Sequence, residues 1–321
     1  VNAYIRTVKH LPLEYAILRA KPRPWEPADC LVAGLLMSYR LNSPRGVKPL
    51  LYQIHNAAGP ELFKELLPWI PESAPYISDG NRKLSASSTH YELPERAAPG
   101  SVASVDDDSP VPLRMRASNW MIFSGAKTTT GKPVFTGSPD LEAVIPSLFY
   151  LIHLKGGRYD VIGGSIAGIP GVHAAGFNGR LAWSITVGHG DNLDYFTETV
   201  HPDNADQYLT ENGYRNFGIA EEVIRIKVRG GFKEEKIKIR TSRHGPVVSE
   251  VMSGLPPNCA LKWPGLMGND GTVEGLLALN QARNFTEFRQ ALGGIRGASV
   301  HLGYADIDGN IGYQYITTFP K

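Results

Sequence analysis

The sequence has little cysteine, no long apolar run and no excess of either charge. Among its 321 residues are two cysteines, Cys30 and Cys259, which lie far apart and outside any CxxC or Cys/His cluster. This argues against a disulfide scaffold and a structural zinc site. No run approaches the roughly 18 to 20 apolar residues that a membrane-spanning helix needs. Lys and Arg (33) nearly balance Asp and Glu (31), so bulk charge argues against nucleic acid as a partner.

Familiar catalytic signatures are also missing. The chain contains no G-x-S-x-G elbow, no Walker loop, no H-E-x-x-H and no G-x-G-x-x-G after a strand. Its 9 histidines are scattered. His173 and His189, in apolar or Gly-rich segments, are more typical of packed or surface residues than of a catalytic base.

Helical and strand patterns occupy different parts of the chain. Residues from about 10 to 70 are helical in pattern, and "WEPADCLVAGLLMSYRL" has Pro27 near a helix start. Residues 78 to 112, with the acidic run Asp106 to Asp108, are rich in Ser, Pro, Ala and Asp and predict a mobile linker. Short strands follow Ser118, and helical patterns return at "VEGLLALNQA" and "NFTEFRQALGGI". This order predicts a layered α+β fold.

Two hairpins are predicted in the strand-rich part. "VIRIKVRGGFKEEKIKIRTS" alternates strictly around Gly230 and Gly231, with Lys and Arg on the wet face. "LGYADIDGNIGYQYI" places two strand patterns around an Asp-Gly-Asn turn. The charges of the first hairpin need no ligand to explain them.

A candidate nucleophile begins the first strongly β-like run. In "RASNWMIFSG", Ser118 lies between an unpatterned polar stretch and that run. A serine hydroxyl is a weak nucleophile and needs a nearby base. If the peptide bond before Ser118 is cut, the freed α-amine, with a reference pKa of about 7.7 to 8.0, can be that base. The residues alone do not distinguish this role from a simpler one, in which Ser118 is only a residue at the start of a strand.

An ordered series of motifs runs along the chain. The segment "SNWMIFSGAKTTTGKPVFTGSPDLEAVIPSLFYLIHLKG" is followed by "IPGVHAAGFNGRLAWSITVGHGDNLDYF", "RHGPVV" and "YADIDGNIGY", and it is preceded by "VNAYI", "LPLEYAIL" and "PRPWEPADC". This series resembles the penicillin acylase family of N-terminal nucleophile (Ntn) hydrolases: the segment from Ser118 is similar to the one that opens the β-chain of these enzymes, and the preceding motifs resemble the α-chain. The resemblance implies an Ntn-hydrolase-like four-layer αββα sandwich, incomplete here. It also implies a helical α-chain part at 1–77, a spacer at 78–117 and the start of the β-chain at 118–321.

The same resemblance implies a self-processing amidohydrolase. Cleavage between Ala117 and Ser118 would give α and β chains from one precursor. Ser118 would then attack the amide of a small molecule with a hydrophobic acyl group, and the Val187 N–H would help form the oxyanion hole. No cofactor is required for this chemistry. The alternatives are a non-catalytic or unprocessed relative that binds at most, and a metal-dependent amidase, for which we find no ligands.

Binding positions are also carried over from the resemblance. Arg40 and Leu41 correspond to the gate beside the acyl pocket, and the pocket wall would include Leu141, Ala174 and Ile185. Asp191 and Asp194, with the carbonyl of Leu193, match a calcium-binding stretch, and oxygen ligands suit a hard cation. Val47 stands near the position of the acid that completes this site in relatives, and it cannot serve. Export to the periplasm or outside the cell is implied by the family alone.

The chain departs from the family pattern at three points. Ala117 stands where Gly is usual, which we expect to slow self-cleavage by restricting the backbone. Asp140 stands where His or Gln is usual, and a carboxylate there would tend to hold the α-amine protonated. The sequence stops at Lys321, before the family's Asn that completes the oxyanion hole. We therefore expect a fragment of a longer precursor.

Overall fold

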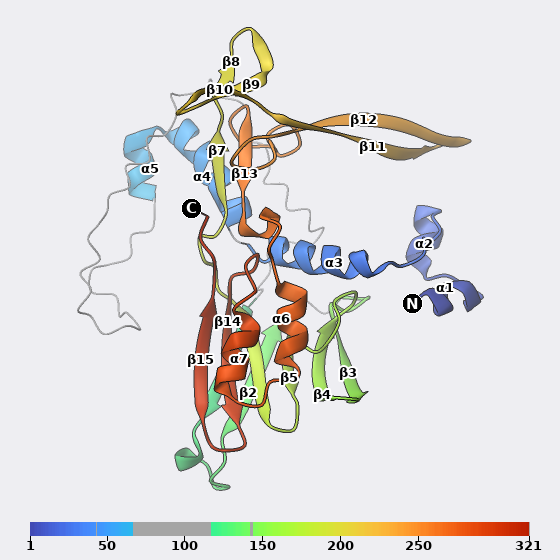
Figure 1. The fold of residues 1–321 in the computed structure, drawn as a ribbon, viewed down its shortest axis with the longest axis vertical. Coiled ribbons are helices and arrows are strands. Elements are labelled where there is room, and N and C mark those ends of the chain that lie inside the picture. Colours follow the sequence, from blue (N-terminus) through green and yellow to red (C-terminus); the bar gives the residue numbers. More distant parts are fainter. Residues whose placement is uncertain (43, 67–116, 142–143, 321) are drawn as a thin grey trace.

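We analysed the fold in a computed structural model, which describes residues 1–42, 44–66, 117–141 and 144–320 (Figure 1). The linker predicted over residues 78–112, including Asp106 to Asp108, lies outside the described residues. Helices form within the range of about 10 to 70 that the N-terminal pattern predicts: α2 (Leu13–Leu18), α3 (Pro27–Arg40), α4 (Pro44–Ala58) and α5 (Pro60–Leu66). Helix α1 (Asn2–Thr7) precedes this range. Helix α3 begins as expected, with Pro27 in its first turn and a capping box between Glu26 and Asp29. No helix of the described residues is both long and apolar enough to cross a membrane.

The centre of the fold is a 6-stranded sheet with the order β15-β14-β6-β5-β4-β3. Its members are β3 (Phe149–Gly156), β4 (Tyr159–Ile166), β5 (Ala175–Phe177), β6 (Leu181–Val187), β14 (Val300–Asp306) and β15 (Ile311–Ile316). All neighbouring strands are antiparallel. The hairpin predicted around the Asp-Gly-Asn turn is confirmed as β14 and β15, and β14 also pairs with β6 from far earlier in the chain.

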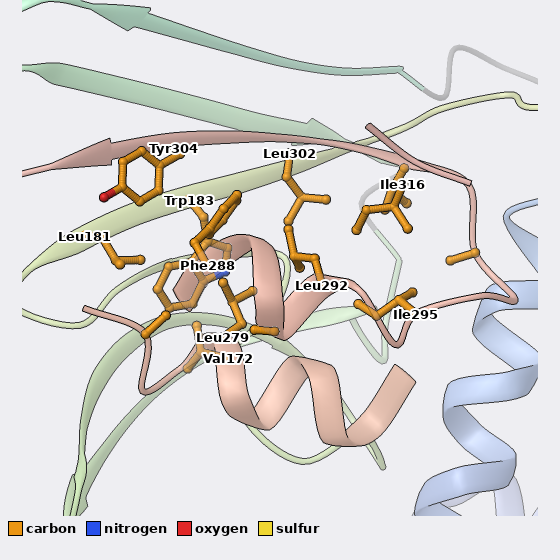
Figure 2. Packing of buried hydrophobic residues seen from close by; sticks show 14 of the residues in the cluster. Val172, Leu181, Trp183, Leu279, Phe288, Leu292, Ile295, Leu302, Tyr304 and Ile316 are labelled. Atoms are coloured by element: carbon orange, nitrogen blue, oxygen red, sulfur yellow. The ribbon is translucent and has the colours of Figure 1, made fainter. Parts of the chain in front are cut away.

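Helices α6 (Thr272–Leu279) and α7 (Phe285–Leu292) cover one face of this central sheet. Successive strand residues point to opposite faces, so every second residue of β6 and β14 faces these helices. Figure 2 shows the resulting cluster, in which side chains from both strands pack around Phe288 and Leu292. The strand residues of this cluster include Leu181, Trp183, Leu302 and Tyr304. This cluster is the main apolar core of the described part.

A hairpin of β1 (Ala117–Phe123) and β2 (Val134–Asp140) lies against the other face of the central sheet. The hairpin packs closely against this sheet. A Cβ added at Gly303 of β14 would lie only 2.8 Å from Phe135 Cζ and 3.0 Å from Trp120 Cε3. Likewise, a Cβ at Gly137 would lie 2.6 Å from Ser184 Cβ on β6. The α+β class is therefore confirmed. The described residues show a helix layer, the central sheet and a hairpin layer, so a four-layer sandwich remains an expectation.

The remaining strands form smaller sheets beyond the central one. They are β7 (Asp194–Thr197), β8 (Val200–His201), β9 (Asn204–Thr210), β10 (Gly213–Asn216), β11 (Gly218–Val228), β12 (Gly231–Thr241) and β13 (Cys259–Lys262). Strands β11 and β12 confirm the predicted charged hairpin, which projects as an arm (Figure 1). Its alternation predicted one covered face, yet every residue of β11 is exposed. The arm projects away from the central sheet (Figure 1), and its printed contacts lie near its base, where Lys238 pairs with Asp206 of β9, and at Lys227, which donates to the Arg19 carbonyl after α2.

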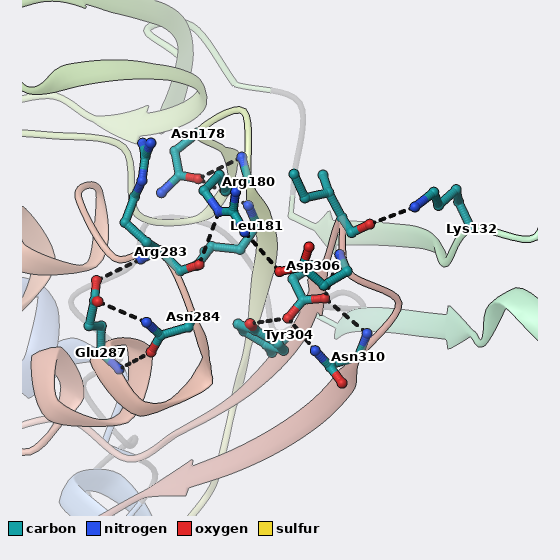
Figure 3. A network of polar contacts seen from close by, with 12 residues as sticks. Lys132, Asn178, Arg180, Leu181, Arg283, Asn284, Glu287, Tyr304, Asp306 and Asn310 are labelled. Carbon is teal, nitrogen blue, oxygen red and sulfur yellow. Dashed lines mark hydrogen bonds and ion pairs between the residues drawn. The ribbon is translucent and has the colours of Figure 1, made fainter.

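Polar contacts fix the end of the central sheet at which β14 turns into β15 (Figure 3). The Asp306 carboxylate accepts hydrogen bonds from the backbone N–H groups of Asp308 (3.0 Å) and Asn310 (2.9 Å). Lys132, in the turn of the β1–β2 hairpin, donates to the carbonyl of Ile307 at 2.8 Å. The hairpin turn is thus anchored at this end. Ser118, near the opposite end of β1, therefore lies toward the other end of β6 and β14.

Candidate active site

Ser118 is a half-buried residue on β1, directly opposite Pro139 of β2. Alternate residues of a strand share a face, so Ser118 points to the same side as Trp120 and Ile122. Those two side chains approach Gly303 on the central sheet. The serine therefore faces the sheet rather than the outer surface of the hairpin.

The part of the sheet toward which Ser118 is directed contains the end of β6. Val187 is the last residue of β6 and lies opposite Val300 of β14. The chain then turns tightly, with the Gly188 N–H donating to the Ser299 carbonyl (2.8 Å) and the Gly190 N–H to Ser299 Oγ (2.9 Å). The predicted nucleophile and the predicted oxyanion donor thus come from different layers and lie toward the same end of the sheet.

The sheet face toward the hairpin carries small and polar residues along β6 and β14. Ser184 and Thr186 alternate with the apolar residues of β6, and His301 lies opposite Thr186. Ser184 Oγ is buried and lacks a hydrogen-bond partner within the described part of the chain. Our reasoning from the sequence missed this face, although the alternation of polar and apolar residues in "LAWSITV" and "SVHLGYAD" is a signal for it.

His301 is a titratable side chain of this face, beside Tyr313 and Tyr315 of β15. Its Nδ1 lies 2.6 Å from the Tyr313 hydroxyl, and its ring stacks on Tyr315 with centroids 4.6 Å apart. Burial, and then the nearby charge of His189, lower the pKa of His301. The neutral form of the His301 imidazole is therefore favoured, and a neutral imidazole can both donate and accept a hydrogen bond. The ring lies on the hairpin-facing side of the sheet, which is also the side of Ser118.

His173 has the packed role that its surroundings predicted. It is buried in the loop between β4 and β5, and its Nε2 accepts a hydrogen bond from the Ile166 N–H at 3.0 Å. Burial lowers the pKa of His173 to about 4. This histidine is a neutral structural acceptor, not a base within the candidate site.

Asp140 lies beside the predicted cleavage junction. Ala117 is its direct partner across the hairpin. The Asp140 carboxylate accepts a hydrogen bond from Asn119 Nδ2 at 3.2 Å and another from Ser138 Oγ. Asn119 and Ser138 are exposed on the outer face of the hairpin, so the structure directs this carboxylate toward the face opposite that of Ser118.

The predicted pocket residues do not form one group in the described structure. Leu141 is exposed just after β2, and Ala174 is buried with its carbonyl accepting from the Ile185 N–H (3.0 Å). The Ile185 side chain packs against the helix-facing core cluster. Arg40 is exposed at the end of α3, and half-buried Leu41 follows it. These residues thus belong to the hairpin layer, the central sheet and the N-terminal helices.

Two of the three predicted calcium ligands, Asp191 and Asp194, are paired with a lysine, and Leu193, between them in the sequence, is buried. Lys48 Nζ lies 2.7 Å from Asp191 Oδ1 and also bonds to Asp194 Oδ1. Burial lowers the pKa of Lys48, but hydrogen bonds to Asp191 and Asp194 outweigh this and raise it overall, so the ammonium stays charged. Within the described ranges, no three His, Cys, Asp or Glu side chains are grouped to hold a metal. This donor set, with an ammonium at its centre, does not fit a divalent cation.

Sequence comparisons show which known proteins this chain resembles. The model of the family described as penicillin amidase matches residues 1–321. The acyl-homoserine lactone acylase QuiP of Pseudomonas aeruginosa is 27% identical over 335 residues, which cover 100% of this chain and 38% of that protein. The penicillin acylase 2 proenzyme of Pseudomonas sp. (strain SE83) is 28% identical over 266 residues, 78% of this chain and 31% of that protein.

A solved structure is similar as well. The thermostable penicillin G acylase from Alcaligenes faecalis has a TM-score of 0.53 and 30% sequence identity, and the match covers 62% of this chain and 35% of that chain. The present chain thus spans well under half the length of the proteins that it matches.

Proposed function

This chain belongs to the penicillin amidase family, and from that premise we propose that it is a self-processing amidohydrolase with Ser118 as its N-terminal nucleophile. Relatives named as acylases support hydrolysis of an amide bond. One observation carries the assignment to Ser118. This serine is the second residue of the hairpin strand that lies over the central sheet, and it points toward the end where Val187 completes β6.

The proposed maturation cuts the bond between Ala117 and Ser118. The Ser118 Oγ attacks the Ala117 carbonyl carbon, the C–N bond breaks, and the acyl group moves from nitrogen to oxygen as an ester. Water then hydrolyses the ester, which leaves a carboxylate on Ala117 and a free α-amine on Ser118. The residues before the cut become the α-chain and those after it the β-chain.

In the proposed turnover, the Ser118 α-amine accepts the proton of its own hydroxyl as Oγ attacks the substrate carbonyl. The Val187 N–H stabilises the developing oxyanion. The ammonium returns the proton to the leaving amine, which departs as the acyl-enzyme ester forms. Water attacks this ester, again with the amine as base, and the acid product is released. The steps need no metal or organic cofactor.

The proposed substrate is a small molecule with a hydrophobic acyl group joined through an amide. The matched relatives are named for acyl-homoserine lactones and for penicillins, so both leaving groups belong in the substrate panel. The proposed fold is the four-layer αββα sandwich, with a second helix layer outside the hairpin. Asp140 beside the junction supports a second candidate, an unprocessed relative that binds without turnover.

Intact-mass measurement of the complete wild-type protein and of Ser118→Ala tests both candidates. We expect two chains from the wild type and one from the variant. Hydrolysis of N-acyl anilides with aliphatic and aromatic acyl groups should fall by at least about 10⁴-fold in Ser118→Ala, because the nucleophile is lost. Ser138→Ala is the matched control, since this exposed serine on the same hairpin points away from the sheet.

Two results would contradict the proposed self-processing enzyme. A wild type that turns over amides with its 117–118 bond intact contradicts the N-terminal amine as base. An uncut wild type without turnover and without stoichiometric labelling of Ser118 by a serine-reactive inhibitor favours the binding scaffold.

A further inference from the structure

An ion cluster joins the N-terminal helices to the strand-rich part of the chain. Lys48 is on α4, Asp191 is in the loop after β6, and Asp194 begins β7 (Figure 1). The Lys48 ammonium is 2.7 Å from Asp191 Oδ1 and also bonds to Asp194 Oδ1. The side chains of Lys48 and Asp194 are only 22% and 25% exposed. The Lys48–Asp194 pair is therefore better shielded from solvent than an ordinary surface ion pair, whereas the Asp191 side chain is 65% exposed.

Neighbouring contacts hold Lys48 in this place. Helix α4 packs beside β7, and the Tyr195 hydroxyl donates to the Arg45 carbonyl at 2.9 Å. Just before α4, Asn42 Nδ2 donates to the Gly297 carbonyl at 3.2 Å. One hydrogen bond holds the residue just before α4 and the other holds the first turn of α4. Lys48, one turn further along the helix, is thereby directed at the two aspartates.

The charge of the cluster explains why a cation is needed there. Asp191 and Asp194 are close enough for one ammonium to contact both, so their carboxylates repel each other when no positive charge lies between them. A hard divalent cation would satisfy such oxygen ligands. An ammonium with its N–H donors also does so, and it would repel any metal ion placed within contact distance of the same oxygens.

We propose that the Lys48 ammonium takes the place of a divalent cation between Asp191 and Asp194, and so fastens α4 to β7 without metal. This inference does not depend on Ser118 being a nucleophile. It assigns to Lys48 the positioning of the N-terminal helical segment against the strands.

Thermal unfolding of the complete protein in EDTA and in millimolar calcium tests the proposal. The wild-type Tm should differ by less than about 1 °C between the two solutions. Lys48→Met should lower the Tm in EDTA by roughly 3 to 6 °C, because Asp191 and Asp194 lose the ammonium that they share. Calcium should restore at least half of this loss, since the aspartates and the Leu193 carbonyl become accessible to it.

Two further variants separate charge from packing. Lys48→Arg keeps the positive charge and should stay within about 2 °C of the wild type, with no response to calcium. Lys238→Ala is the matched control, because Lys238 pairs with Asp206 at 2.6 Å on the exposed surface. Its Tm should change by less than about 2 °C and should not depend on calcium.

The proposal is overturned if calcium stabilises the wild type and the double variant Asp191→Asn, Asp194→Asn removes that gain. It is also overturned if Lys48→Met unfolds at the wild-type temperature in EDTA. Should Lys48→Met fail to fold, calorimetric titration of calcium into the wild type decides instead: millimolar or tighter binding that Asp191→Asn abolishes refutes the proposal, and the absence of binding supports it. None of these readouts is activity, so they stand apart from the Ser118 test.

Discussion

The two faces of the central sheet are built from the same strands and are filled differently. On the helix-facing side, Trp183, Leu302 and Tyr304 are almost completely buried among apolar side chains. The neighbouring residues of the same strands, such as Ser184 and His301, face the hairpin instead. On that side Gly303 has no side chain, which leaves space for the rings of Trp120 and Phe135. One face is an apolar core packed against two helices, and the other carries small and polar residues under the β1–β2 hairpin.

This difference shows how one strand serves packing and chemistry together. The period of a strand is two residues, so apolar side chains can fix the backbone of β6 and β14 against the helices. The alternate positions are then free to carry polar groups at a fixed distance from the hairpin. Ser118, the proposed nucleophile on the hairpin, is thereby held over a rigid backbone, and precise positioning of reacting groups requires such rigidity.

The largest loss of stability should come from the helix-facing core. Phe288 is fully buried within this cluster, so Phe288→Ala should lower the free energy of unfolding by about 3 to 5 kcal/mol in urea. Thr286→Ala, at an exposed position of the same helix, should change it by less than about 0.5 kcal/mol. The folded variant should keep kcat/KM within about 2-fold. A stability loss below 1 kcal/mol would show that this face is not the core.

The next largest effect should appear on lowering the pH. The folded-state pKa of His173 is about 4, below the ordinary value of 6.5, because burial disfavours the charged ring. Its contribution is therefore complete above pH 6.5 and is lost as the pH falls toward 4, by roughly 3 kcal/mol. Urea unfolding at several pH values measures this slope. His173→Gln should flatten it, whereas His10→Gln, at an exposed position, should not; equal slopes in all three proteins would contradict the assignment.

The smallest loss of stability, with a larger loss of function, should come from the hairpin-facing side. A Cβ at Gly137 would lie 2.6 Å from Ser184 Cβ, so Gly137→Ala should push the hairpin outward and destabilise by about 1 to 2 kcal/mol. Because Ser118 moves with the hairpin, kcat/KM should fall by roughly 10²-fold. Gly156→Ala is the control, since its Cβ would meet nothing within 4 Å. Unchanged activity in Gly137→Ala would separate the hairpin from the active site.

Much of the fold could be predicted from local patterns. Pro27 and the apolar spacing behind it predicted the helix that became α3, and the Asp-Gly-Asn turn predicted the β14–β15 hairpin. The ordered motifs around Ser118 predicted the family, and the family match over residues 1–321 confirms it. The alternating pattern of β11 predicted that one of its faces is covered, and this prediction was wrong, because every residue of β11 is exposed. The pattern of a strand does not specify which part of the molecule lies against it.

The sequence by itself determined the helices, the hairpins and the position of Ser118 at the start of a strand, because these depend on neighbours within a few residues. Only the tertiary structure placed β14 beside β6, His301 on the hairpin-facing side and Lys48 between Asp191 and Asp194. Those contacts join residues more than a hundred positions apart. They form because separate apolar faces are buried against each other, and no local pattern encodes which faces will meet.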